Sequence, residues 1–162
     1  MGRVMGSLGL GMKASDQCIA LIRHFEGFSA KPYRCPAGIP TIGYGSTRYA
    51  DGRKVTMQDP PITMEQADEI VANTLVEYED AVNRYVTVPI AQHQFDSLVD
   101  FAYNCGAQNL RSSTLLKKVN AVDFTGAAGE FHKWVYGGGK PMPGLVKRRA
   151  SEAALWRDAL VF

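Results

Sequence analysis

Hydrophobic residues follow a helical period at the start of the chain. Cys18, Ile22 and Phe25 recur at three- and four-residue steps, which predicts a helix with one buried face. Ser15 is a suitable N-cap for this helix, and Gly27 favours its end. On such a face, Cys18 is expected to act as a small core residue.

The pattern changes between Tyr33 and about Thr56. Glycines and prolines become frequent, and the short β-forming stretches between them lack a helical period. Residues 50–53 read Ala-Asp-Gly-Arg, and the Asp-Gly pair is typical of a turn between two strands. This segment predicts a small antiparallel sheet.

The longest periodic stretch covers about residues 63–85. It begins with Thr63-Met64-Glu65-Gln66, which has the pattern of a capping box. At ~1.5 Å per residue the helix spans about 30 Å and is expected to connect two lobes. The glycines at 137–139 are expected to form a loop. Further helices are predicted at Phe95–Tyr103, at Leu115–Val119, from Asp123 through Phe131 and Trp134, and from Pro143 to Trp156.

Composition places the chain among globular proteins. Its 162 residues favour one domain, and 46% are apolar while 21% are charged. No apolar run approaches the ~18 residues of a membrane span, so no stable membrane insertion is expected. The first eleven residues are glycine-rich and are expected to be a flexible extension of a domain at 12–162, with no secretion signal.

The formal charge is unevenly distributed. Residues 50–82 hold eight acids and two bases, whereas residues 111–162 hold nine bases and four acids. A basic C-terminal half could meet an anionic polymer such as a cell wall or a nucleic acid, although ordinary solvated helix faces explain it too. The three cysteines and three histidines show no metal-ligand spacing and no disulfide framework.

The candidate chemistry lies between Leu21 and Thr47. Glu26 ends the first predicted helix beside apolar residues, where a carboxyl group can be desolvated and can hold a proton near neutrality. Cys35 comes nine residues later and Thr41 six after that, followed by Ile-Gly-Tyr-Gly.

This arrangement resembles the catalytic signature of the phage-type lysozymes, glycoside hydrolase family 24. The flanking Phe25, Gly27 and Tyr33 are also similar to the family, although many members carry Asp where this chain has Cys35. Two downstream regions add to the resemblance, which covers about residues 15–157. They are Asn104-Cys105-Gly106 with Leu110–Leu116, and Gly144-Leu145 with Lys147-Arg148-Arg149 and Glu152.

The resemblance implies an α+β, lysozyme-like fold. A small antiparallel β lobe and a larger helical lobe would be joined by a long helix, with the substrate cleft between them. It further implies an endolysin that hydrolyses the β-1,4 bond between N-acetylmuramic acid and N-acetylglucosamine with inversion, and without cofactor or metal. Glu26 would be the general acid, and Cys35 and Thr41 would orient or activate water.

Further site residues are nominated on the same basis. Arg148 or Arg149 could pair with the acid. Each of the other residues also has a structural explanation, for example Tyr103 in the core and Ser113 as a helix cap. The nominated substrate contacts are Tyr44, Ser46, Thr47, Tyr103 and Ser113.

The implied partner is the peptidoglycan glycan strand, and a monomer is expected. The protein would be made in the host cytoplasm and would reach the periplasmic wall after a holin permeabilises the membrane. One alternative is a catalytically impaired peptidoglycan-binding or scaffolding protein on the same fold. A nucleic-acid binder is a weaker alternative, because no recognised motif is present.

Overall fold

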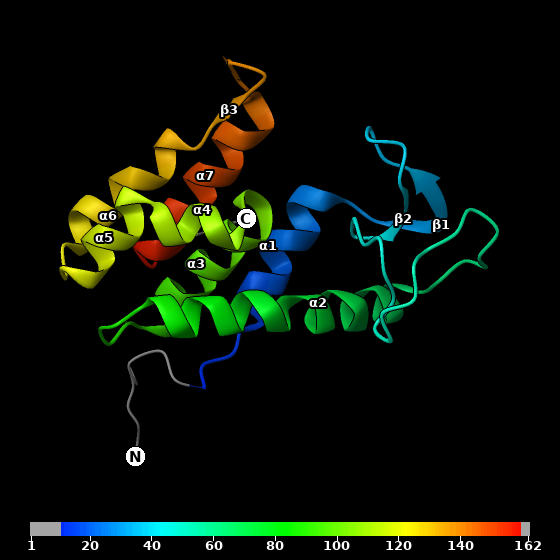
Figure 1. Cartoon of the computed structure of the whole chain (residues 1–162), viewed down its shortest axis with the longest axis horizontal. Coiled ribbons are helices and arrows are strands. Elements are labelled where there is room, and N and C mark those ends of the chain that lie inside the picture. Colours follow the sequence, from blue (N-terminus) through cyan, green and yellow to red (C-terminus); the bar gives the residue numbers. More distant parts are fainter. Residues whose placement is uncertain (1–10, 160–162) are drawn as a thin grey trace. The chain divides into compact units, whose positions relative to one another are not determined.

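The computed structural model describes residues 11–159 (Figure 1), so the predicted extension lies outside the described residues except for its last glycine. Contacts divide the chain into two compact units. The β unit is Ile19–Val76, and the helical unit comprises the chain up to Cys18 and from Glu77 onward. In chain order the elements are α1 (Asp16–Glu26), β1 (Ser29–Arg34), β2 (Pro40–Gly43), α2 (Met64–Tyr85), α3 (Gln92–Cys105), α4 (Ala107–Ser112), α5 (Thr114–Asn120), α6 (Phe124–Glu130), the 3₁₀ helix η1 (Phe131–Lys133), β3 (Tyr136–Gly137), β4 (Lys140–Pro141) and α7 (Pro143–Trp156).

The first helix begins and ends as its sequence predicts. The Gln17 N–H donates to Ser15 Oγ at 3.3 Å, which confirms the N-cap. Gly27 has a φ of +70° and its N–H donates to Arg23 O at 3.1 Å, so the helix ends there. Cys18 is fully buried and its pKa lies well above the usual value, mainly because burial disfavours the thiolate.

The predicted antiparallel sheet is present and starts earlier than expected. Strand β1 begins at Ser29, before the predicted start at Tyr33, and it includes Pro32. The β1–β2 register is interrupted between Ser29 and Tyr33, where proline has no N–H to offer the ladder. The predicted Asp-Gly turn is confirmed by a bridge between Arg48 and Lys54.

Helix α2 runs unbroken for 22 residues (Figure 1). The capping box is confirmed, since the Thr63 N–H donates to Gln66 Oε1 at 2.8 Å and the Gln66 N–H donates to Thr63 Oγ1 at 3.1 Å. Ala67, Val71 and Leu75 lie on its buried face. Their spacing is the one from which the helix was predicted.

The helical unit contains two elements that periodicity does not reveal. Helix α4 has only six residues, too few for a recognisable period. The predicted glycine loop is instead the turn of a hairpin between β3 and β4, with a φ of +59° at Gly138 and +82° at Gly139. Left-handed conformations of this kind are easily adopted by glycine.

The predicted helix caps are found in the helical unit, whereas the helix expected to continue through Trp134 ends at Glu130 and is followed by η1. Ser113 caps α5, Asp123 caps α6, and Trp156 is buried. Trp134 is half-buried and follows η1, with its ring 5.4 Å from that of Phe101. Among residues 11–159, no helix combines the length and the apolarity that crossing a membrane requires.

Candidate active site

Glu26 is the last residue of α1 and is half-buried. Its carboxyl group lies directly against Gly45. A Cβ built on Gly45 would be 3.0 Å from Glu26 Oε1 and 3.6 Å from Cδ, a tight contact that would displace the carboxyl group by a few tenths of an ångström. The backbone of the Ile-Gly-Tyr-Gly segment therefore fixes one side of the space that the Glu26 carboxyl group occupies.

The short turn between β1 and β2 carries Cys35. The Cys35 N–H donates to Ile39 O at 3.1 Å, and the Gly38 N–H donates to Cys35 O at 2.7 Å. The pKa of the Cys35 thiol is lowered, first by the backbone N–H of Ile39 against an opposing contribution from burial, and then by the Ala37 N–H and the Thr41 hydroxyl. Backbone N–H groups converging in a tight turn stabilise an anion, here the thiolate.

Thr41 belongs to β2 and pairs with Tyr33 of β1. Its side chain is buried, with 2% of the residue exposed, and its hydroxyl donates to Ile39 O at 2.8 Å. A hydroxyl has one proton, so Thr41 can donate either to Ile39 O, as it does here, or to the Cys35 thiolate, and in the present arrangement its oxygen lone pairs remain as acceptors.

The pKa of Tyr33 depends on both candidate catalytic groups, Glu26 and Cys35. Burial raises the pKa of Tyr33, and the negative charges of Glu26 and Cys35 raise it further. The structure therefore brings Glu26, Cys35 and Tyr33 within electrostatic range in the β unit. Tyr33 was matched to the family by sequence but was not nominated as a site residue.

The two glycines of the Ile-Gly-Tyr-Gly segment have separate roles. Reciprocal backbone hydrogen bonds of 2.8 and 2.9 Å between Ile42 and Ser46 close the turn that contains both. A Cβ on Gly43 would lie 3.1 Å from the Cβ of Ala67 on α2, whereas a Cβ on Gly45 would meet Glu26. Gly43 thus permits packing, and Gly45 leaves room for the acid.

The nominated substrate contacts of the β unit differ in accessibility. Tyr44 is 4% exposed, and its ring lies 5.4 Å from that of Phe28, so its side chain belongs to the core. Ser46 is buried in the turn, whereas Thr47 is exposed. Of the three side chains, Thr47 is the one that solvent reaches.

The nominated contacts of the helical unit have structural partners. The Tyr103 ring packs edge-on against Tyr78 at 5.5 Å. The Ser113 hydroxyl donates to Leu110 O at 2.7 Å and accepts from the Leu116 N–H at 3.0 Å. Ser113 therefore caps α5, while substrate contact at either residue stays a prediction.

Both nominated arginines are buried in the helical unit. Arg148 makes a two-pronged ion pair with Asp100, with distances of 3.0 and 2.8 Å. Arg149 lies 2.7 Å from Glu152 and donates to Asn104 Oδ1 at 2.7 Å. The pairing of either arginine with the acid stays a prediction. Within residues 11–159, no three His, Cys, Asp or Glu side chains are grouped as metal ligands.

Comparison with known proteins agrees with this geometry. The profile of the phage lysozyme family matches residues 23–152. An endolysin of Acyrthosiphon pisum secondary endosymbiont phage 1 is 38% identical over 91% of this chain and 100% of its own length. The solved endolysin from Escherichia coli O157:H7 phage FAHEc1 has a TM-score of 0.87 and 36% identity, covering 94% of this chain and 98% of its own.

A third similar protein is the solved muramidase domain of SpmX from Asticcacaulis excentricus. It has a TM-score of 0.76 and 33% identity, and the match covers 89% of this chain and 97% of that domain. The lysozyme-like α+β fold predicted from the sequence is thereby confirmed. The chain belongs to the phage lysozyme family, and with it to the lysozyme class of hydrolases.

Proposed function

We propose that this chain is an endolysin-type muramidase that hydrolyses the β-1,4 bond between N-acetylmuramic acid and N-acetylglucosamine. The observation that carries the proposal is the grouping of Glu26, Cys35 and Thr41 around the β1–β2 turn and the adjoining glycine segment. Breaking a glycosidic bond requires a proton for the leaving oxygen and a water activated on the opposite face of the sugar. These three side chains can supply both requirements.

Glu26 acts as the general acid in this proposal. Its proton goes to the glycosidic oxygen as the bond to the anomeric carbon breaks, and the remaining carboxylate is later reprotonated from solvent. Gly45 keeps the carboxyl group in place, because its missing Cβ leaves room for Oε1. Proton delivery by a positioned acid contributes about 10²- to 10⁴-fold to the rate.

Cys35 and Thr41 act on the water. One water O–H donates to Thr41 Oγ1, whose own proton is already directed to Ile39 O. The other O–H points to the Cys35 sulfur, which takes the proton as the water oxygen attacks the anomeric carbon. The lowered pKa of the thiol supports this role, because the thiolate rather than the thiol is the base. Attack from the face opposite the leaving group inverts the anomeric centre.

The first experiment follows the turbidity of purified cell walls with the native protein and with Glu26→Gln. We expect native protein to clear the walls and Glu26→Gln to retain less than about 1% of the rate, given the contribution of a positioned acid. Its thermal midpoint should be equal or higher, because functional acids are rarely optimal for stability. Residual activity above that level contradicts the acid role of Glu26.

The same assay separates the alternative. A catalytically impaired wall-binding or scaffolding protein would sediment with the walls without clearing them. New reducing ends on N-acetylmuramic acid, rather than on N-acetylglucosamine, identify the bond that is cut.

We also propose that the protein is a monomer that accumulates in the host cytoplasm and reaches the wall after a holin permeabilises the membrane. Expression without a permeabilising agent should then leave cells intact.

A further inference from the structure

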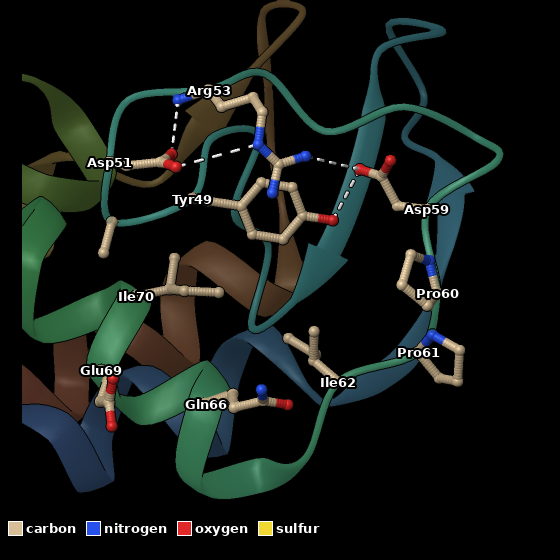
Figure 2. A pocket seen from close by; sticks show the side chains of 11 residues that line it. Tyr49, Asp51, Arg53, Asp59, Pro60, Pro61, Ile62, Gln66, Glu69 and Ile70 are labelled. Carbon is tan, nitrogen blue, oxygen red and sulfur yellow. Dashed lines mark hydrogen bonds and ion pairs between the residues drawn. The ribbon is translucent and has the colours of Figure 1, made fainter.

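A pocket lies in the β unit, between the 48–54 hairpin and the start of α2 (Figure 2). Its volume is about 400 Å³, within the range of small-ligand sites. Glu26, Cys35 and Thr41 do not line it, so the proposed reaction leaves it without a role.

One wall of the pocket is held rigidly. The Tyr49 hydroxyl donates to Asp59 Oδ2 at 2.7 Å, and Asp59 also accepts from the Thr56 N–H at 2.9 Å and from the Thr56 hydroxyl at 2.7 Å. Burial and the bond to Asp59 raise the pKa of Tyr49 to about 12, and the bonds from Thr56 and Tyr49 lower the pKa of Asp59 to about 2. The pair therefore keeps one protonation state across the physiological pH range.

Arg53 lies on this wall and makes two long ion pairs, with Asp51 and Asp59. Its guanidinium lies over the Tyr49 ring (Figure 2), and the distance from the guanidinium carbon to the ring centre is 4.4 Å. Nε is 3.9 Å from Asp51 Oδ2 and Nη1 is 4.0 Å from Asp59 Oδ2, which is too long for hydrogen bonds. Within residues 11–159, no acceptor takes a hydrogen bond from this guanidinium. A planar, oriented group that makes only these long ion pairs is suited to a shorter, two-pronged bond with a carboxylate.

The opposite wall is apolar with polar groups at its edge. Ile62 and Ile70 point toward Tyr49 in Figure 2. Gln66 uses its Oε1 in the capping box, which leaves its amide N–H₂ as a further donor. Asp51 and Glu69 add negative charge, so the lining favours a ligand that carries an ammonium group together with a carboxylate.

From these features we infer that the pocket binds the short zwitterionic stem peptides attached to peptidoglycan glycan strands. Arg53 takes a peptide carboxylate, the apolar wall takes aliphatic side chains, and the acidic edge takes the free amino group of a diamino acid. The inference rests on the proposed function for its choice of ligand. It assigns the β unit a peptide-reading site separate from the site of hydrolysis.

Steady-state kinetics on two substrates test the inference. Glycan strands that carry their peptides are compared with strands from which an amidase has removed them. We expect Arg53→Gln to raise KM about 5- to 10-fold on peptide-bearing strands, the loss typical of a charge-assisted bond, without changing kcat. On peptide-free strands its KM should equal that of the native protein. Equal changes on both substrates, or no change on either, overturn the inference.

Lys54→Gln is the matched control, because it removes the same charge one residue along the hairpin and does not line the pocket. It should leave the ratio of the two KM values unchanged. Arg53→Lys keeps the charge and loses the two-pronged geometry, so its KM should fall between those of the native protein and Arg53→Gln. If Arg53→Gln fails to fold, Arg53→Lys decides the result alone.

A binding measurement keeps this inference apart from the proposed function. The tripeptide L-alanyl-γ-D-glutamyl-L-lysine is titrated into ¹⁵N-labelled native protein, and amide shifts are followed. Saturable shifts at residues 49–53 and 62–70, weakened at least five-fold by Arg53→Gln, are expected. Failure of the proposed function appears instead as no hydrolysis of either substrate while the tripeptide still binds. Absence of shifts at millimolar tripeptide overturns the inference.

Discussion

Cys35 in the β unit and Cys105 in the helical unit have opposite environments. Cys35 is half-exposed in a turn whose N–H groups lower its pKa. Cys105 ends α3, and burial raises its pKa to about 11 even though the Arg149 guanidinium donates to its sulfur. At Cys105, desolvation thus outweighs a full positive charge. At Cys35, which lies near solvent, a few backbone dipoles outweigh desolvation. Proximity of charge alone does not identify a reactive thiol.

The surroundings of Cys105 extend this contrast. Arg149 is fully buried and connects Asn104 with Glu152, so the two downstream motifs of the sequence meet at its guanidinium. The pKa of Glu152 is raised well above its usual value, mainly by burial and then by Asp100. These groups are ion-paired with one another in the interior, as expected of a structural cluster. Around Cys35, by contrast, backbone N–H groups lower the pKa of the thiol.

The largest expected effect concerns the buried cluster around Arg149 in the helical unit. Arg149→Met leaves Glu152 buried without its partner, which typically costs about 3–5 kcal/mol of unfolding free energy. Urea denaturation measures the loss. Arg157→Met changes an exposed arginine and should stay within about 0.5 kcal/mol of the native protein. An Arg149→Met variant as stable as that control would show that the pairing is not what stabilises the cluster.

The next effect concerns the β-unit thiol. Cys35→Ser should lose about 10²-fold in rate, because a hydroxyl is neither an anion nor a base in this pH range. Cys35→Asp should retain activity, and the pH limit set by the thiol should be replaced by one near ~4, in the range of a carboxylate. Rates of wall clearing across pH 3–10 measure both. A Cys35→Ser variant with the native rate contradicts the role of the sulfur.

Alkylation sharpens the comparison between the thiols. Cys35 should react first, since its pKa is lowered and its residue is accessible, whereas the pKa values of Cys18 and Cys105 are raised. Mass spectrometry locates the modified residue while clearing is followed in parallel. Full activity of protein quantitatively alkylated at Cys35 would mean that its sulfur only fills space.

A smaller effect tests how the acid is positioned. Gly45 and Gly52 have φ values of +83° and +87°, so alanine is strained at either position. Nothing lies within 4 Å of a Cβ on Gly52, whereas a Cβ on Gly45 meets Glu26. We expect both substitutions to cost about 1–2 kcal/mol of stability, and Gly45→Ala alone to lower kcat, by about 10-fold. Equal kcat values for the two variants contradict the positioning role of Gly45.

The smallest effect is a pH dependence of stability that comes from Asp59 in the β unit. The folded-state pKa of Asp59 is about 2, below its unfolded value of ~3.9. A lowered carboxyl pKa means that its stabilisation is present above pH ~4 and is lost as the pH falls toward 2. Asp59→Asn should therefore be less stable than the native protein at pH 6 and should approach it near pH 2. A difference that is constant between pH 6 and pH 2 contradicts this assignment.

Short-range sequence patterns determined the helix ends and the family of this protein. The Ser15 cap, the capping box at Thr63 and the Gly27 helix end depend on neighbouring residues, so their bonds could be predicted from short spacings. The family likewise follows from the order of Glu26, Cys35 and Thr41. Helix α4 was missed because six residues do not reveal a period, and β1 began early because a proline within a strand has the same sequence signal as a proline before one.

Only the tertiary structure decided which polar groups are available. Sequence alone nominated Tyr44 and Ser113 beside Thr47, but burial and hydrogen bonding depend on what packs against each side chain from distant parts of the chain. The contact between Gly45 and Glu26 spans 19 positions in the sequence, and the platform of Tyr49, Arg53 and Asp59 has no local pattern. Desolvation sums over all surrounding atoms, which is why the opposite pKa shifts of Cys35 and Cys105 required the folded chain.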